Sequence, residues 1–490
     1  MSVDTWNKRG ADKRSRLFYS IPEEWKLRTF YGRESHVLNI PTECGKLSAE
    51  ELSITNSTAS DLVEKLSRGE LKAVDVTIAF CKRTTVAHQL VRCFHEFFPE
   101  KAIAQTKELD EYFEIHKKPI GPLHGLPISI NDQFRIEVKT HFLKRSIKTK
   151  TLTSKQGQET SMGCIAWLGK YDTTESMLVT LLRKAGAVLY TKTTVSQTLM
   201  SGETSNNIIA VTSNPRNNAW SAGGRGSVRV PAAFNFLYGI KPSHGRTPHS
   251  KMANSLEGQE TAHSIIGPIA HTAAVIPLPW RSCEEDIARS KVAGKLTLGY
   301  FRSDCVVNPH PPILRGIDEA GILNNLKASG EPVLPYNKRV LKSTKSHLNV
   351  NELWEIQLKQ WEYQSKYLER WRKFEEETGT KLDAIIAPVA ATAAIRHGQF
   401  RYYGYSSVIN LLDFTSAVVP VTFAQKSVDL KPSNYTPLNK LDAAVHAEYD
   451  PEVYDGAPVA LQVIGCRLSE ERILVIAEEI GRLLGNSQTP

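Results

Sequence analysis

The stretch AWSAGGRGSVRVPAAFNFLYGIKPSHGR, residues 219–246, places three glycines around one serine, Ser227, ahead of an apolar run. Glycine tolerates positive φ and lets the backbone approach a ligand closely, so a serine framed by glycines can be presented at the floor of a pocket. Free backbone N–H groups in such a turn can also hold an anion or a developing oxyanion. Most Gly-Gly-x-Gly-Ser stretches are ordinary loops, so a catalytic interpretation of Ser227 needs support from other parts of the chain.

The composition is typical of a soluble globular protein. The chain has 490 residues, 41% hydrophobic and 23% charged, enough for one large α/β unit or two or three ordinary domains. Residues 1–18 lack an apolar core and no apolar run reaches membrane-spanning length, so we expect neither a secretory signal nor a membrane partner. The seven cysteines are scattered without a CxxC pair, which favours reduced thiols and a cytoplasmic location. No carboxylate or histidine pair has metal-ligand spacing, so no metal is expected.

The formal net charge of +9 is concentrated in one segment. Residues 138–156, VKTHFLKRSIKTKTLTSKQ, hold five lysines, one arginine and no acidic residue, and the remainder of the chain is close to balanced. A module that binds nucleic acid would interleave aromatic residues with its lysines, but only Phe142 is present here. We therefore expect no nucleic-acid partner.

The N-terminal part of the structured chain is predicted to be helical. Residues 1–47 are rich in charge, show little periodicity and are interpreted as an N-terminal arm. Asp61 with Glu64 resembles a capping box at the start of a helix. Apolar residues then recur at helical spacing over 74–93 and 102–115.

Helices alternate with short apolar strands in the rest of the chain. A strand is expected at 128–130, and a helix at 175–185 leads through Gly186 into a buried strand at 187–191, the repeating unit of an α/β sheet. The long helical pattern 353–374 carries an apolar stripe that we interpret as core packing. This stripe comprises Trp354, Leu358, Trp361, Leu368 and Trp371. Further strands are predicted at 237–240, 296–301, 383–387, 417–422 and 459–464, followed by a helix at 470–484.

Two separated segments together resemble the amidase signature family, and specifically its fungal, acetamidase-like branch. They are GPLHGLPISINDQF at 121–134 and GGRGSVRVPAAFNFLYGIKPSHGR at 223–246. Matches in the same order extend over most of the chain from about residue 38 onward, including PTECG at 41–45, AGAVLYTKTTVSQTLMSGETSNN at 185–207 and SLEGQETAHSIIGP at 255–268. The resemblance implies one α/β domain over residues 48–490, with a large mixed β-sheet flanked by helices on both faces.

The resemblance also implies a reaction. Members of the family hydrolyse linear carboxamides, small aliphatic or aromatic ones in this branch, to a carboxylate and ammonia without a cofactor. A buried lysine acts as base, a bridging serine relays the proton, and a second serine attacks the carbonyl while a glycine turn holds the oxyanion. The partner implied is a small-molecule amide, and a homodimer is compatible with the family.

Site residues follow from the match position by position. Ser227 matches the nucleophile, Asn131 occupies the lysine position, and Arg225 with Gly226 falls in the oxyanion region. Residues Met200, Ser201 and Gly202 match the acyl-binding segment, although a simple loop explains that segment equally well. His124 and His244 are interpreted as structural residues of turns or of the pocket wall rather than as a base.

The chain departs from the family's pattern at the residues that carry the chemistry. An amide at Asn131 cannot take a proton from a serine. The family's loop with the bridging serine is missing near 224–226, so Ser221 is at best a neighbour, and Arg225 replaces a glycine. If two deletions occurred there, Ser227 descends from an upstream part of the loop. Two functions stay open: an amidase with impaired activity, or a catalytically inactive amidase-fold protein that is a ligand-binding remnant or the product of a faulty gene model.

The basic segment 138–156 interrupts a family-like sequence. Its removal joins Glu137 to Gly157 and restores FRIEGQETSMG; valine codons begin with GT and glutamine can be encoded by CAG, which suggests a translated intron. Family segments also look absent between Ala274 and Val275 and near 330–337. The alternative is a functional, divergent set of loops.

Overall fold

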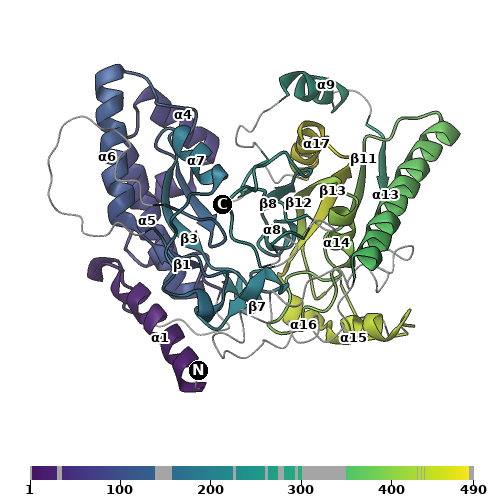
Figure 1. Ribbon diagram of the computed structural model, residues 1–490, viewed down its shortest axis with the longest axis horizontal. Helices are drawn as coiled ribbons and strands as arrows, with labels where there is room; N and C mark the ends of the chain where they lie inside the picture. The colour runs from purple at the N-terminus through teal and green to yellow at the C-terminus, as the bar shows by residue number, and fades with distance from the viewer. Residues whose placement is uncertain are drawn as a thin grey trace.

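The protein is described by a computed structural model. The structure describes residues 3–29, 36–137, 157–224, 228–255, 257–259, 263–273, 281–292, 296–300, 349–427, 429–431, 433–434 and 436–484. The basic segment 138–156, the residues Arg225, Gly226 and Ser227, and the region 330–337 lie outside these ranges. Figure 1 shows an N-terminal half built mainly of helices beside a C-terminal half organised around a sheet.

The N-terminal arm contains a long helix, α1 (Val3–Tyr19), which the weak hydrophobic periodicity of residues 1–47 did not indicate. Its Lys13 is buried and forms ion pairs with Glu96 and Glu159. Arg14 donates to the carbonyl oxygen of Ile208 at 2.6 Å. The helix is mostly polar and is held by these specific contacts, so the hydrophobic pattern of the sequence contains little trace of it.

The predicted N-terminal helices are confirmed. They are α3 (Ala49–Asn56), α4 (Ala59–Arg68), α5 (Ala73–Val91) and α6 (Pro99–His116), after the short α2 (Ile40–Glu43). The cap of α4 differs from the prediction: Thr58 is the N-cap, and its Oγ1 accepts from the Asp61 backbone N–H at 3.2 Å. Asp61 therefore lies inside the first turn instead of starting a capping box.

Three strands form a small sheet against these helices, in the order β1-β3-β2. They are β1 (Phe94–Phe97), β2 (Pro127–Asn131) and β3 (Val188–Thr193), the last preceded by α7 (Met177–Lys184). β2 and β3 run parallel, with Asn131 opposite Thr193. The apolar side of β3 joins the core formed with α5, where Val188 and Val76 are fully buried.

The larger sheet has six strands in the order β10-β11-β13-β12-β8-β9. β10 (Leu298–Tyr300) is parallel to β11 (Ala384–Pro388), and the other neighbours are antiparallel, so the sheet is mixed as predicted. The remaining strands are β8 (Tyr238–Lys241), β9 (Ile269–Ala270), β12 (Thr415–Phe423) and β13 (Pro458–Gly465). The described strands thus form two main sheets instead of one continuous sheet.

Helices cover both faces of the six-stranded sheet, which confirms the predicted α/β architecture. Ala417 and Val419 of β12 pack with α17 (Glu470–Leu483) on one face. Val418, between them, points to the opposite face, where it packs with α8 (Arg229–Phe234). This alternation is the period-two pattern of a strand buried on both sides.

The remaining elements are short or peripheral. The helices are α9 (Ser282–Val292), α14 (Gly404–Leu411), α15 (Lys440–Glu448) and α16 (Pro451–Tyr454), with 3-10 turns at Glu23–Trp25, Ile165–Trp167 and Gln197–Leu199. Two small hairpins pair β4 (Ser205–Asn206) with β5 (Ala210–Val211) and β6 (Ser213–Asn214) with β7 (Asn217–Ser221). They lead the chain toward the glycine turn at 223–224.

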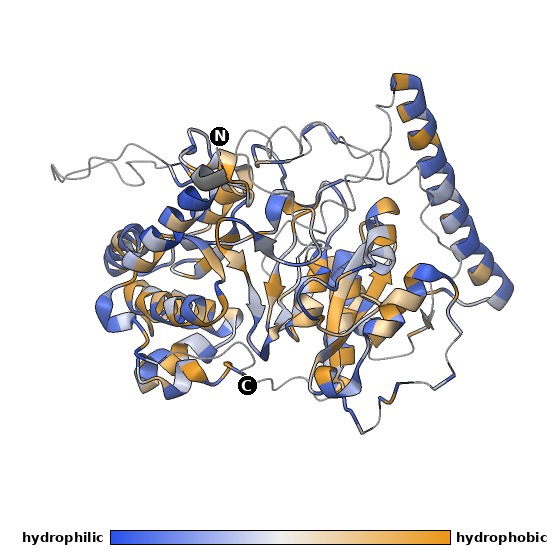
Figure 2. Cartoon of the chain, turned by 90° about the horizontal axis from the view of Figure 1, so that it is seen from below, coloured by the Kyte–Doolittle hydropathy of each residue, from blue (hydrophilic) through white to orange (hydrophobic). Residues whose placement is uncertain are grey.

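The interpretation of the α13 stripe as core packing is wrong for most of its members. In α13 (Val350–Thr378), Trp354 is 62% and Trp361 is 64% exposed, and Leu358 and Leu368 are exposed as well, whereas Trp371 is buried. The helix contacts the body through a neighbouring face that includes Ile356 and Trp371. Figure 2 shows this long helix at the edge of the molecule, largely hydrophilic with hydrophobic residues at intervals.

Candidate active site

The sequence match places the family's lysine position at the end of β2, and Asn131 is the last residue of that strand. Its Oδ1 accepts from the Gln133 backbone N–H at 3.2 Å, and its carbonyl oxygen accepts from the Phe134 N–H at 3.0 Å. The side chain therefore closes the turn that follows the strand. A carboxamide in this place is a hydrogen-bonding group without basic character near neutral pH.

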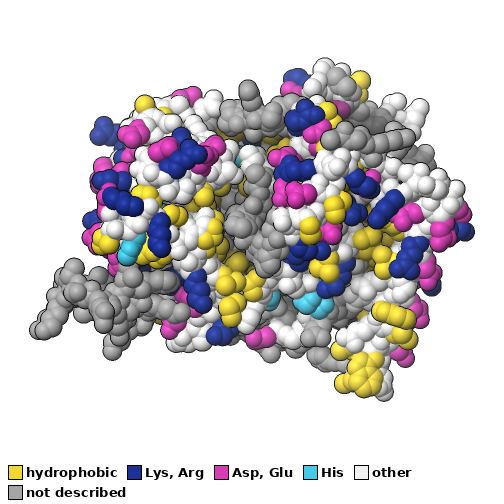
Figure 3. All heavy atoms as spheres, turned by 90° about the horizontal axis from the view of Figure 1, so that it is seen from above, with side chains coloured by type: hydrophobic (Ala, Val, Ile, Leu, Met, Phe, Trp, Pro, Cys, Tyr) yellow, Lys and Arg dark blue, Asp and Glu magenta, His cyan; other side chains and the backbone are white. Residues whose placement is uncertain are grey.

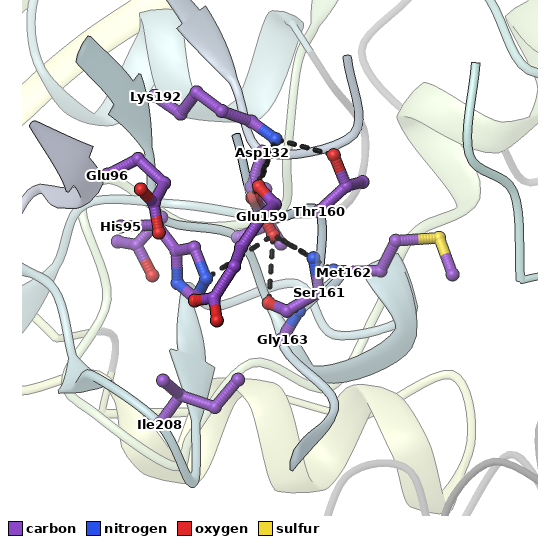
Figure 4. A network of polar contacts seen from close by, with 12 residues as sticks. His95, Glu96, Asp132, Glu159, Thr160, Ser161, Met162, Gly163, Lys192 and Ile208 are labelled. Atoms are coloured by element: carbon purple, nitrogen blue, oxygen red, sulfur yellow. Dashed lines mark hydrogen bonds and ion pairs between the residues drawn. The ribbon is translucent and has the colours of Figure 1, made fainter. Parts of the chain in front are cut away.

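The next residue, Asp132, is the centre of a buried polar network (Figure 4). Its Oδ2 accepts from the Ser161 N–H at 3.0 Å, the Ser161 Oγ–H at 2.9 Å and the Met162 N–H at 2.9 Å. Burial by itself would raise the pKa of Asp132, but His95, Lys192 and the hydrogen bonds from Ser161 lower that pKa to about 2. Asp132 is thus a fixed anion that ties the end of β2 to the segment around Ser161.

Lys192 on β3 supplies the cation of this network. Its Nζ lies 3.1 Å from Asp132 Oδ1 and donates to the Glu159 carbonyl oxygen at 2.6 Å and to Thr160 Oγ1 at 2.7 Å. The ammonium group thus makes two hydrogen bonds and one ion pair. Lys192 is fully buried and held as an ion-paired donor, so it does not replace the base that Asn131 lacks.

The network extends to α1 through a second set of charges. Lys13 bridges Glu96 of β1 and Glu159, whose Oε2 lies 2.6 Å from Lys13 Nζ. His95, next to Glu96, is buried with its Nε2 3.9 Å from Asp132 Oδ2. Burial is the main cause that lowers the pKa of His95, to about 4, so this imidazole is neutral at physiological pH.

The glycine turn ahead of Ser227 is described up to Gly224. Gly223 has φ +87, and the Ser221 Oγ accepts from its backbone N–H at 3.1 Å. A Cβ on Gly224 would lie 2.6 Å from the Ser201 carbonyl oxygen, so only glycine fits against this segment. The structure therefore brings Ser201, one of the predicted acyl-binding residues, against Gly224. The predicted oxyanion residues Arg225 and Gly226, and Ser227, lie outside the described residues.

The three predicted acyl-binding residues lie inside the fold. Met200 and Ser201 are each 5% exposed, and a Cβ on Gly202 would collide with the ring of Phe400. The Ser201 Oγ accepts from the Glu203 N–H at 3.2 Å, which closes the local turn. This segment is tightly packed and lies against Gly224 of the glycine turn.

Directly after the glycine turn, Arg229 on α8 is fully buried without a carboxylate beside it in the described ranges. It donates to Gln462 Oε1 at 3.1 Å, to the Ser406 carbonyl oxygen at 2.7 Å and to Asn410 Oδ1. Burial lowers the pKa of Arg229 to about 9. These bonds fix α8, and hence the end of the glycine turn, against β13 and α14.

A further buried lysine, Lys241, was not recognised as a functional candidate from the sequence. Burial, and after it the positive charge of Arg229, lower the pKa of Lys241 to about 7, and Asp413, 3.6 Å away, opposes this shift. Its Nζ donates to the carbonyl oxygens of Pro242 and Phe414 at 3.1 and 2.8 Å. The signal available in the sequence was a single lysine at the end of an apolar strand, but its lowered pKa depends on burial and on Arg229, which only the folded structure brings together.

The two histidines interpreted as structural have structural contacts. His124 Nδ1 accepts from the Ile120 N–H at 3.3 Å within a turn, and the ring of His244 stacks on His263 with centroids 3.7 Å apart. In the described ranges there is no group of three or more His, Cys, Asp and Glu side chains that could hold a metal ion.

Two features of the structure concern possible partners: the hydropathy of the helices and the distribution of charge on the surface. None of the helices within the described ranges is long and apolar enough to cross a membrane. On the face shown in Figure 3, basic and acidic side chains are interspersed over the described part of the chain.

Comparisons with known proteins agree with this architecture. A family model described as Amidase matches residues 75–225, 224–337 and 321–474, so the match is divided at the glycine turn and again within 321–337. The acetamidases of Emericella nidulans and Aspergillus oryzae are each 49% identical over 565 aligned positions, covering 99% of this chain and 100% of the relative. Since the chain has 490 residues, these relatives contain segments without a counterpart here.

More distant relatives and solved structures show the same family and fold. A putative amidase of Schizosaccharomyces pombe is 31% identical over 569 positions, covering 99% of this chain and 100% of the relative. A fatty acid amide hydrolase structure superposes with a TM-score of 0.86 at 24% identity, covering 99% of this chain and 96% of that one. A bacterial aryl acylamidase gives a TM-score of 0.62 at 14% identity, covering 89% and 99% of the two chains. The chain therefore belongs to the amidase family, in the branch that contains the fungal acetamidases.

Proposed function

We propose that this protein is an amidase for small linear carboxamides, aliphatic or aromatic, whose turnover is impaired by the loss of its catalytic base. The whole-length similarity to two acetamidases supports the substrate class. The reaction adds water across the amide C–N bond and yields a carboxylate and ammonia. The observation that carries the impairment is Asn131 at the end of β2, where a carboxamide stands in place of a base.

The buried lysine on the strand beside Asn131 does not restore that base. Lys192, the buried lysine on the neighbouring strand, is paired with Asp132 and donates to two further oxygens, so its ammonium group is already engaged. Loss of a general base typically costs a factor of about 10² to 10⁴ in rate. We therefore expect slow hydrolysis in which Ser227 is the nucleophile.

The glycine turn gives a second reason for impairment. The family match is divided at residues 224–225, which supports the proposal that a loop with the bridging serine is missing there. Arg225 would add bulk and charge to the oxyanion region that it forms with Gly226. Met200, Ser201 and Gly202 remain packed beneath the turn, which supports their assignment to the acyl-binding site.

The domain organisation is proposed on the same basis. Residues 48–490 form one amidase-like domain, and the arm 1–47 docks on it through α1. Residues 138–156 are proposed to be an insertion derived from an intron. The genomic sequence tests this, because an uninterrupted homologous coding stretch without splice signals would contradict it.

The remaining proposals concern location and assembly. The protein is proposed to be cytoplasmic and to have a small-molecule amide, not a nucleic acid, as its partner. A homodimer is compatible with the family. Light scattering on the purified chain measures the assembly.

Asn131 also favours the alternative function, a catalytically inactive protein with the amidase fold. One experiment distinguishes the impaired amidase from the inactive protein. Ammonia release from acetamide and benzamide is measured for the wild type, Ser227→Ala, Asn131→Lys and the matched control Asn131→Gln. We expect slow release that Ser227→Ala abolishes, that Asn131→Lys raises at least about tenfold by restoring a base, and that Asn131→Gln leaves unchanged. No release from any of these proteins would establish the non-catalytic remnant instead.

A further inference from the structure

A cavity of about 850 Å³ lies between the N-terminal helices and the six-stranded half of the molecule. Its walls come from the connection between α3 and α4, from α5, from the start of β8, from the segment after β9, and from α9 and α17. In Figure 1, α5 and the pair α9 and α17 belong to opposite halves. This volume is within the range of small-molecule sites, and the cavity does not include any residue assigned to the amide-hydrolysing site.

The charges on the α9 and α17 side of the cavity neutralise one another. Arg289 lies 2.7 Å from Glu285 and 3.0 Å from Glu478, and Arg482 lies 2.5 Å from Glu479. Both carboxylates of α17 that line the cavity are therefore engaged by an arginine. This wall offers little net charge to a ligand.

Arg83, on the opposite wall, is different. Its Nη1 donates to Thr55 Oγ1 at 2.9 Å and to Asn56 Oδ1, both neutral acceptors. Among the described residues no carboxylate pairs with it. The guanidinium is half-buried, and burial lowers the pKa of Arg83, the sign of a cation without a compensating anion.

A second nitrogen group faces the same space. His271 lines the cavity after β9 and keeps solvent contact, yet its pKa is lowered, first by burial and then by the positive charge of Arg83. Both groups line the same cavity, and the positive charge of Arg83 disfavours the charged form of His271. An anion between them would oppose this effect.

We propose that this cavity binds a small organic monocarboxylate, with its carboxylate on Arg83 and His271 and its apolar part against Phe80 and Tyr238. The planar guanidinium matches a carboxylate in two parallel hydrogen bonds. A single negative charge fits better than a phosphate, because Arg289 and Arg482 are already paired with Glu478 and Glu479 and Arg83 is left as the unpaired guanidinium among the described residues that line the cavity. The aromatic rings of Phe80 and Tyr238 provide apolar wall area for an aliphatic or aromatic body.

Calorimetric titration of the full-length protein with benzoate tests the site, with benzamide as the neutral isostere and inorganic phosphate as the competing anion class. Benzoate should bind saturably. Arg83→Gln should weaken this binding at least about tenfold, as expected for a lost charge-assisted pair, while the control Arg68→Gln, an exposed arginine of α4, should not change it. The affinity for benzamide should be the same in the wild type and in Arg83→Gln.

A second variant keeps the test decisive if Arg83→Gln fails to fold, which circular dichroism reports. Val292→Trp places a large side chain in the cavity from α9 and leaves the residue Arg83 in the sequence. This variant should also abolish benzoate binding. Benzoate binding that survives in both variants, or benzamide binding of equal strength with the same dependence on Arg83, would overturn the site. Phosphate bound more tightly than benzoate would overturn the assignment to a monocarboxylate.

Discussion

Lys192 Nζ lies 3.1 Å from Asp132 Oδ1, and both side chains are fully buried. The pair joins β3 to the residue that follows Asn131, so an ion pair fixes the end of β2 where Asn131 lies. Breaking a buried pair by removing one partner leaves an uncompensated charge, which costs far more than loss of a surface pair.

Lys192→Met is therefore expected to destabilise the protein by about 3–5 kcal/mol, because Asp132 would remain buried without its cation. Chemical denaturation followed by circular dichroism measures the change in the free energy of unfolding. The control Lys117→Met removes one partner of an exposed pair with Glu114 and should leave the stability unchanged. Similar midpoints for both variants would show that the pair does not stabilise the fold.

His95 predicts a dependence of stability on pH. The pKa of His95 is lowered from 6.5 to about 4, chiefly by burial, so the unfolded chain binds a proton that the folded protein excludes between these values. The free energy of unfolding should fall as the pH is lowered through this window, by roughly 3 kcal/mol at about 1.36 kcal/mol per pKa unit. Asp132, with its pKa lowered to about 2, should add a loss at still lower pH, below its unfolded value of 3.8.

Denaturation midpoints measured across this pH window check the assignment. His95→Gln, which does not titrate, should flatten the dependence, whereas His116→Gln, on the exposed surface of α6, should preserve it. An unchanged slope in His95→Gln would assign the effect to other groups.

Most secondary structure near the candidate site was predictable, because local apolar patterns specify it. The strand expected at 128–130 is β2 (Pro127–Asn131), and the strand expected at 187–191 is β3 (Val188–Thr193). The network around Asp132 was not predictable in the same way. It joins residues of separate elements, and no periodicity within one element records such a contact.

The buried face of the long helix α13 could not be predicted from the spacing of its apolar residues. Its apolar stripe has helical spacing, but spacing does not say whether the rest of the fold covers that stripe. Trp354 and Trp361 are exposed, whereas Trp371, nearly three turns after Trp361, is buried and contacts Phe414. The tertiary packing of the C-terminal half decides which face is covered.

The exposure of these tryptophans gives a direct prediction. Trp371→Ala should cost about 3–5 kcal/mol, the usual range for truncation of a buried aromatic side chain. Trp361→Ala should change the free energy of unfolding by less than about 1 kcal/mol, because its ring is mostly in solvent. Chemical denaturation of both variants compares them, and equal losses would mean that the outer face of α13 is covered in solution.

Lys13 predicts how α1 is attached. Its ammonium group is buried between Glu96 and Glu159, so Lys13→Ala would leave two carboxylates close together without their cation. We expect α1 to detach and become cleavable by trypsin at its many basic residues, well before the rest of the protein is digested. The control Lys8→Ala changes an exposed lysine of the same helix and should leave the digestion pattern unchanged. If Lys13→Ala resists trypsin as the wild type does, then Arg14 and the apolar contacts of Leu17 hold the helix without the buried ion pairs.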